Sequence, residues 1–72
     1  MSAADANVIL RGGAAEALPP SERIRRVDDV RDTFKLFLGN RYEHFRPTSE
    51  TQHHNGRSLR VFAWLDSTYV AE

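Results

Sequence analysis

The chain has 72 residues and no cysteine, which excludes disulfides, thiolate metal ligands and a cysteine nucleophile. Ten Lys and Arg balance ten Asp and Glu, so a general attraction to nucleic acid or to anionic membranes is not expected. The length allows one small domain, residues 1–72, and no segment reaches the roughly 20 apolar residues of a membrane helix or carries an export signal. We therefore expect a single cytoplasmic domain.

The first third of the chain predicts one short strand followed by a loop. Residues 1–6 are small and polar, and we expect them to be disordered. Residues 7–11 contain three consecutive apolar residues and end at a Gly-Gly pair, which predicts a strand. Residues 12–20 are mainly Gly, Ala and Pro and predict a loop. Residues 22–27 fit either a short strand or a helical turn.

Residues 28–38 predict a helix of about three turns. Their apolar side chains recur at helical spacing; they are Val30, Phe34, Phe37 and Leu38. Asp29 can cap the N-terminus of this helix, and Gly39 suits the position just after its end.

The same segment also has a pattern typical of a strand. Phe34, Leu36 and Leu38 alternate with their neighbours, and Gly39-Asn40 could close a hairpin into Tyr42. The pattern favours the helix, but it leaves residues 29–38 open between helix and strand.

Residues 42–70 predict an antiparallel meander around a tight turn at Asn55-Gly56, because a type I′ hairpin turn needs positive φ at both central residues. Pro47 lacks an N–H group, so the first strand should lie at an edge or be interrupted there. A second turn is expected at Asp66-Ser67, before Thr68 to Val70.

The Asn55-Gly56 turn also predicts the pairing of the two strands. A two-residue loop makes the numbers of paired residues sum to 111, which places Pro47 opposite Trp64 and Ser49 opposite Phe62. One face of the meander is then aliphatic and the other aromatic. The aliphatic residues are Leu59, Val61, Ala63 and Leu65, and the aromatic ones are Phe62, Trp64 and Phe45.

These elements predict an α+β fold, with one helix packed on the aliphatic face of a small antiparallel sheet; an all-β sheet or barrel is the alternative. The helix leaves the aromatic face uncovered. Residues 8–27, a second subunit of a homodimer, or a ligand or partner could close it.

The tetrapeptide Tyr42-Glu43-His44-Phe45 offers the best candidates for chemistry. On a strand Tyr42 and His44 share one face, while Glu43 and Phe45 share the other. His44 could act as a general acid or base beside Tyr42, with Trp64 and Tyr69 lining a cavity between two subunits. No cofactor or metal is predicted, because His53-His54 alone supplies too few ligands.

A binding surface is the other kind of site that the residues suggest. Its candidate members are Phe62, Trp64, Phe45, Tyr69 and Arg60. A single-stranded nucleic acid could stack on such aromatic residues, but only Arg60 is placed to flank them, so nucleic-acid binding is the least favoured function.

Several short motifs together resemble a family of very short actinobacterial proteins of unknown function. They are Val8 to Gly13, the tetrapeptide at Tyr42, the Asn55-Gly56 turn with Val61 to Trp64, and Tyr69 to Glu72. The resemblance implies a gene near those for specialised-metabolite biosynthesis, and it brings no catalytic residue. We expect an accessory or interaction protein that assists a biosynthetic enzyme, with a small-molecule-processing enzyme and a nucleic-acid-binding regulator as alternatives.

Overall fold

The computed structural model describes residues 6–69, which form one five-stranded β-sheet. The elements are β1 (Val8–Arg11), η2 (Gly13–Ala17), η3 (Pro20–Glu22), β2 (Ile24–Arg25), β3 (Phe34–Leu38), β4 (Arg41–His54) and β5 (Arg57–Tyr69). In this part of the chain the only helical segments are the short 3₁₀ helices η2 and η3. The predicted α+β class is therefore wrong, and the all-β alternative describes the fold.

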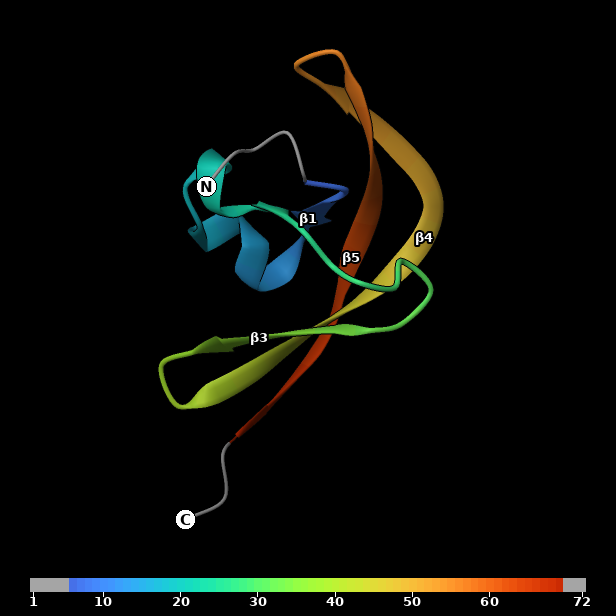
Figure 1. The fold of residues 1–72 in the computed structure, drawn as a ribbon. Coiled ribbons are helices and arrows are strands. Elements are labelled where there is room, and N and C mark those ends of the chain that lie inside the picture. Colours follow the sequence, from blue (N-terminus) through green and yellow to red (C-terminus); the bar gives the residue numbers. More distant parts are fainter. Residues whose placement is uncertain (1–5, 70–72) are drawn as a thin grey trace.

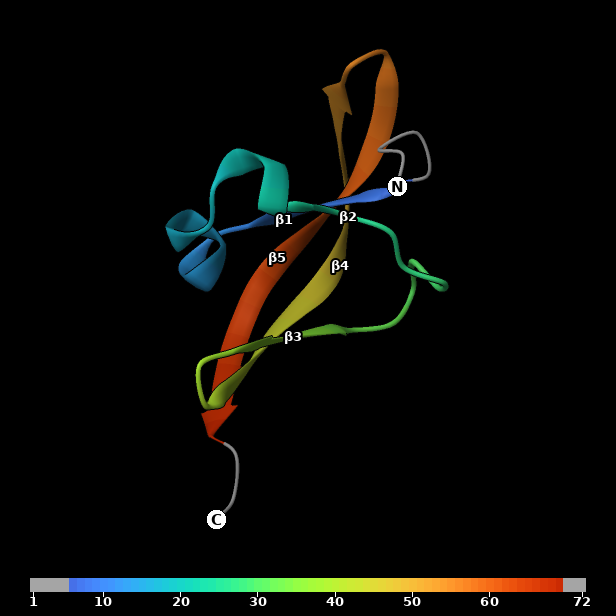
Figure 2. The same ribbon diagram turned by 60° about the vertical axis from the view of Figure 1, so that its left-hand side comes forward.

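The strands are arranged in the order β2-β1-β5-β4-β3. The β1–β5 pair is parallel and the other pairs are antiparallel. Figure 1 shows β4 and β5 as a long twisted hairpin, with β3 crossing one end and β1, η2 and η3 beside the middle. The turn between β4 and β5 projects from the other end as a two-stranded arm, which is also visible in Figure 2.

The predicted helix at residues 28–38 is replaced by turns and by β3. Every residue of β3 pairs with β4 in an unbroken register, from Phe34 opposite Phe45 to Leu38 opposite Arg41. The Asp29 carboxylate, expected to cap a helix, instead accepts the N–H of Arg31 in a turn. Strand alternation directs Leu36 into the core. The backbone groups of β3 find their hydrogen-bond partners on β4, and the spacing of apolar residues within 28–38 cannot show this pairing.

The core lies on the face of the sheet that carries Phe45 and Phe62, both of which are completely buried. Val8 and Leu10 of β1, Ala15 of η2 and Leu36 of β3 belong to the same buried cluster. Around it pack partly buried apolar residues, among them Ala14, Leu18 and Val27. Closure of the aromatic face by residues 8–27 is thus confirmed for these two phenylalanines, and β3 completes it.

The Asn55-Gly56 turn is confirmed, since Asn55 has φ of 51° and Gly56 has φ of 78°, as a type I′ turn requires. The predicted sum of 111 holds from His54 opposite Arg57 to Thr51 opposite Arg60. An irregularity between Pro47 and Thr51 then shifts the pairing by two residues. This interruption beside the proline was expected.

The shift makes two predicted pairs wrong. Pro47 lies opposite Phe62 rather than Trp64, and Trp64 lies opposite Phe45. Ser49 falls within the irregularity and has no partner in the ladder described for residues 6–69. Because a shift of two residues preserves the alternation of side chains, the side chains of β5 stay on their predicted faces as far as Trp64.

The turn predicted at Asp66-Ser67 is also wrong, because β5 continues to Tyr69, opposite Arg41. A second irregularity, between His44 and Phe45, inserts Leu65 as an extra residue in β5, so that Asp66 and Thr68 lie on the opposite face from Trp64 and the predicted alternation is wrong beyond Leu65. A bulge bends and twists a strand without ending it. Val70 lies outside the described residues.

The remaining expectations concern the first residues and the aliphatic face. Residues 1–5 lie outside the described part of the chain, while Ala6 is buried. The predicted loop at 12–20 contains η2 and the start of η3.

On the predicted aliphatic face, Leu59 and Val61 are buried without a helix above them, whereas Leu65 is exposed. Among residues 6–69, no helix is long and apolar enough to cross a membrane.

Phe62→Ala is expected to lower the free energy of unfolding by about 3–5 kcal/mol, because it removes a fully buried ring from a small core. Leu65→Ala, at an exposed position of the same strand, should change it by less than about 0.5 kcal/mol. Urea denaturation measures both values. Phe62→Leu provides a milder variant if the alanine variant does not fold, and equal losses for Phe62→Leu and Leu65→Ala would contradict the assigned core.

Candidate functional site

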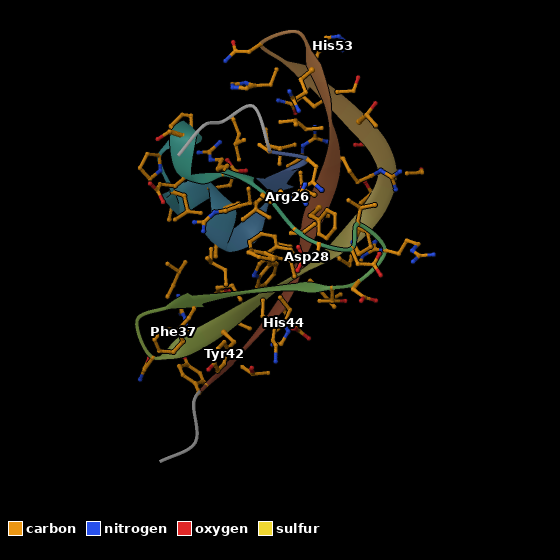
Figure 3. The ribbon with its side chains drawn as sticks, in the orientation of Figure 1. Arg26, Asp28, Phe37, Tyr42, His44 and His53 are labelled. Atoms are coloured by element: carbon orange, nitrogen blue, oxygen red, sulfur yellow. The ribbon has the colours of Figure 1, made fainter. Side chains whose placement is uncertain are left out.

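The end of the sheet where β3, β4 and β5 lie side by side carries a surface that faces away from the core. We call it the outer face; its residues are Lys35 and Phe37 of β3, Tyr42 and His44 of β4, and Asp66 and Thr68 of β5. Strand alternation and the pairing register place these side chains on the same side. Figure 3 shows Phe37, Tyr42 and His44 at this end, with His53 at the far tip of the arm.

An exposed pair of aromatic rings is the main apolar feature of the outer face. Phe37 and Tyr42 lie opposite each other on β3 and β4, and their ring centroids are 5.1 Å apart at an angle of 53°. Phe37 is 55% exposed and Tyr42 is 38% exposed. The Lys35 ammonium lies 5.5 Å from the centre of the Tyr42 ring, within the range of a cation–π contact.

His44 lies next to this aromatic pair on the same face. Its Nε2 atom is 3.0 Å from Thr68 Oγ1, and Lys35 and Asp66 are its direct neighbours on β3 and β5. The predicted sharing of one face by Tyr42 and His44 is confirmed.

The structure does not bring the other predicted catalytic neighbours to His44. Trp64 lies opposite Phe45, which points into the core, and Tyr69 lies opposite Arg41 on that same inner side. Tyr42 and His44 are therefore separated from Trp64 and Tyr69 by the sheet. The proposed set of four does not form one site within this chain.

A buried carboxylate lies directly behind the outer face. Glu43 is only 2% exposed, and its Oε1 accepts a hydrogen bond of 2.9 Å from the indole Nε1 of Trp64. Its Oε2 lies 3.0 Å from Nε of Arg41, but no donor among the described residues is aligned for a hydrogen bond to Oε2. We interpret the Arg41 contact as an ion pair that compensates the buried charge.

The Trp64 indole also contacts the N-terminal segment. A Cβ atom added to Gly13 would overlap the indole ring, and one added to Gly12 would meet Trp64 Cβ at 3.8 Å. The Gly12 N–H is bonded to Glu16 Oε2 at 3.1 Å. Gly13, Trp64, Glu43 and Arg41 therefore form one connected inner cluster.

Sequence reasoning missed this inner cluster. The Gly-Gly pair indicates only the end of β1, and close approach to Trp64 depends on contacts between distant parts of the chain. The available signal was the tetrapeptide, which places Glu43 on the same face as the buried Phe45. A carboxylate on a buried face needs a partner.

The candidate binding residues are divided between the core and separate surfaces. Phe45 and Phe62 are completely buried, Trp64 is 38% exposed and Tyr69 is 72% exposed. Arg60 is half-buried, and its guanidinium donates to the carbonyl of Thr48 at 3.2 Å. These residues do not form the continuous stack of exposed rings flanked by arginine that single-stranded nucleic acid would require.

The tip of the arm carries His53 and His54. His53 is exposed, whereas His54 is half-buried, with its Nε2 atom 3.3 Å from the side-chain nitrogen of Asn55. Residues 6–69 contain no group of three or more His, Asp or Glu side chains that could hold a metal ion.

Ion pairs at the surface connect part of the charge-rich segment between η3 and β3. Arg25 lies 3.5 Å from Glu22, and Arg31 lies 3.1 Å from Asp29. The Arg31 hydrogen bond lowers the pKa of the exposed Asp29 carboxyl. The stabilisation from this pair is therefore present above the ordinary pKa of aspartate and is lost as the pH falls through the lowered value.

Residues 2–72 match the model of a family described as a family of unknown function, DUF5988. The chain belongs to this family, which confirms the resemblance to short proteins of unknown function. It matches no curated protein and no solved structure.

Gly13→Ala should displace the indole of Trp64. Gly39→Ala is a matched control, because Gly39 also has a positive φ of 63° but has no atom within 4 Å of an added Cβ. The control should lower the free energy of unfolding by about 1–2 kcal/mol, through backbone strain alone. Gly13→Ala should lower it by about 1–3 kcal/mol more, because the added Cβ also overlaps the indole. Urea denaturation measures this difference.

Fluorescence gives an independent test of the same contact, because Trp64 is the only tryptophan. Its emission should shift in folded Gly13→Ala and remain unchanged in Gly39→Ala. Identical spectra and stabilities for the two variants would show that Gly13 is not packed against the indole.

Glu43→Gln should lower the free energy of unfolding by about 1–3 kcal/mol. The amide oxygen can still accept the Trp64 N–H, but the charge that pairs with Arg41 is removed. Glu50→Gln is the control, since Glu50 forms an exposed ion pair with Arg11 at 2.7 Å and should change stability by no more than about 1 kcal/mol. Chemical denaturation compares the two, and a larger loss for Glu50→Gln would contradict the role given to Glu43.

Proposed function

We propose that this chain is a small accessory protein that binds another protein through its outer face. We further propose that the partner is an enzyme of specialised-metabolite biosynthesis, the class that the family resemblance implies. The observation that carries the proposal is the exposed Phe37–Tyr42 pair. Aromatic residues are enriched among the residues that dominate protein interfaces.

The core gives a reason to treat these two rings as functional. Phe45 and Phe62 already fill the inner side of the sheet together with residues from β1, η2 and β3. Phe37 and Tyr42 point to the other side, where they contact each other while both remain exposed to solvent. Their exposure is therefore not explained by the packing of the core.

The polar residues of the outer face support recognition of a protein surface. Lys35, His44, Asp66 and Thr68 lie beside the aromatic pair, and their register is set by the pairing of three strands. An apolar centre with polar neighbours is the usual composition of a protein interface. Because they lie on paired strands, these groups have fixed relative positions before a partner binds.

An enzyme that uses His44 has less support. The His44 ring is hydrogen-bonded to Thr68. Of the residues predicted to form a catalytic site with it, Tyr42 alone lies on the same face. Trp64 and Tyr69 lie on the other side of the sheet. A nucleic-acid-binding regulator has less support still, because Phe45 and Phe62 are buried.

Phe37→Ser and Tyr42→Ser should each weaken binding to the partner enzyme by at least about 30-fold, the equivalent of roughly 2 kcal/mol at an interface centre. Calorimetric titration with biosynthetic enzymes encoded near the gene measures this effect. His53→Ser, at the far tip of the arm, should leave the affinity unchanged.

The same variants distinguish the accessory protein from an enzyme. A pathway that tolerates Phe37→Ser and Tyr42→Ser but stops with His44→Ala would refute the proposed interface and favour catalysis. Loss of pathway product in step with loss of binding is the expected result.

A further inference from the structure

The outer edge of β3 is unpaired within residues 6–69. β3 is the last strand of the sheet and pairs only with β4. It contains five residues, Phe34 to Leu38, without a proline or a bulge in its pairing, and Lys35 is its only charged residue. The N–H and C=O groups along such an edge form a template for another strand, and Lys35 is the one charged side chain of β3 that protects it.

The turn after β3 determines which backbone groups point outward. Gly39 has φ of 63° and occupies the first position of a two-residue turn, as in a type II′ hairpin. Such a turn is closed by a hydrogen-bonded pair, here Leu38 with Arg41. Bonded and non-bonded pairs alternate along an antiparallel ladder, so Lys35 and Phe37 direct their N–H and C=O groups away from β4.

We propose that a second copy of this chain pairs with that edge, with β3 antiparallel to β3 about a two-fold axis at Leu36. In this register Lys35 lies opposite Phe37 of the second copy, and Phe37 lies opposite its Lys35. These are the residues whose backbone groups point outward, so both pairs can exchange N–H and C=O bonds. A symmetric edge-to-edge contact closes as a dimer and leaves no further β3 edge for growth.

The side chains of β3 suit pairing with themselves. On the inner side, Phe34 would face Leu38 of the second copy, and Leu36 would face its own equivalent, which extends the apolar cluster that these residues already border. On the outer side, the Lys35 ammonium near Tyr42 would also approach the Phe37 ring of the second copy. A lysine opposite an aromatic ring avoids direct opposition of like charges.

The charges at the two ends of β3 are complementary in this register. Beyond the five strand residues, Asp32 of one copy lies toward the Gly39-Asn40 turn of the other copy, near its Arg41. The segment before β3 contains Asp28, Asp29 and Asp32 with only Arg31 to oppose them, whereas the Arg41 side chain at the other end is 43% exposed. Arg41 already pairs with the buried Glu43 carboxylate, so Asp32 would add a second acidic neighbour to its exposed guanidinium at each end of the antiparallel pair. A parallel arrangement would lose this proximity.

The dimer would join two outer faces into one surface with two Phe37–Tyr42 pairs. In this respect the inference rests on the proposed function, because it gives the binding surface its full extent. The dimer itself is measurable without any partner enzyme.

Sedimentation equilibrium of the full chain tests the dimer directly. The expected mass is about twice the 8.2 kDa of one chain, and a mass that stays at 8.2 kDa up to about 1 mM would overturn the proposal. Lys35→Pro removes an N–H that points outward and leaves the hydrogen bonds to β4 intact. It should raise the dimer dissociation constant by at least about 100-fold. Lys35→Thr keeps the N–H but removes both lysine–ring contacts, and should raise the constant by no more than about 30-fold, less than the proline variant.

A charge exchange tests the register and does not depend on proline being tolerated. Phe37→Lys places a lysine opposite Lys35 of the second copy and should give a monomer. The double variant K35E/F37K places Glu opposite Lys in both pairs and should restore the dimer. A dimer that persists in F37K, or that K35E/F37K fails to restore, would overturn the β3–β3 register.

Tyr42→Ser separates this proposal from the proposed function, since Tyr42 belongs to the outer face but not to the β3 edge. Its mass should remain that of a dimer while binding to the partner enzyme weakens by at least about 30-fold. The wild-type chain could instead be a monomer that loses partner binding when Lys35→Pro is introduced. That result would mean that the β3 edge accepts a strand from the partner. It would refute the homodimer and support the proposed interaction function.

Discussion

The position of the Trp64 indole is the constraint on which the rest of the structure depends. On one side the ring lies against Gly13 of η2, and its N–H is bonded to Glu43 of β4. Trp64 itself belongs to β5, so one side chain connects both long strands to the N-terminal segment. That segment provides the residues that close the core over Phe45 and Phe62. A chain of this length buries a limited fraction of its surface, and a single contact of this kind is hard to replace.

Closure of the inner side determines which residues are left for function. Phe62 and Phe45 look available from the sequence because no local pattern shows what covers them, and β1 and η2 in fact bury both. The exposed rings are instead Phe37 and Tyr42, on the opposite side of the sheet. One of them comes from the segment that predicts a helix, where its outward position on an edge strand cannot be recognised.

Turn chemistry and local alternation made part of this fold predictable. Asn55-Gly56 determines its turn through backbone preferences of two adjacent residues, and the strand at 7–11 was evident from its composition. The apolar residues of 28–38 fit both the spacing of a helix and the alternation of a strand. Pairing with residues 41–45 makes residues 34–38 a strand. The register beyond Pro47 depended on bulges. The division into two faces holds as far as Trp64, but the extra residue at Leu65 exchanges the faces of β5 beyond it. What covers each face depends on contacts distant in sequence.

Size connects the exposed outer face with the unpaired edge of β3. Covering Phe37 and Tyr42 from within would take a further layer of chain, but residues 8–27 already close the inner side. Among residues 6–69, the two exposed rings and the outer edge of β3 are uncovered, which is why both proposals invoke another molecule. Binding to the folded chain alone would stabilise it in proportion to the concentration of that molecule, so self-association and partner binding would both oppose unfolding. In the proposed dimer and complex, the features that expose the outer face would therefore also be the ones that make a small fold depend on its partners.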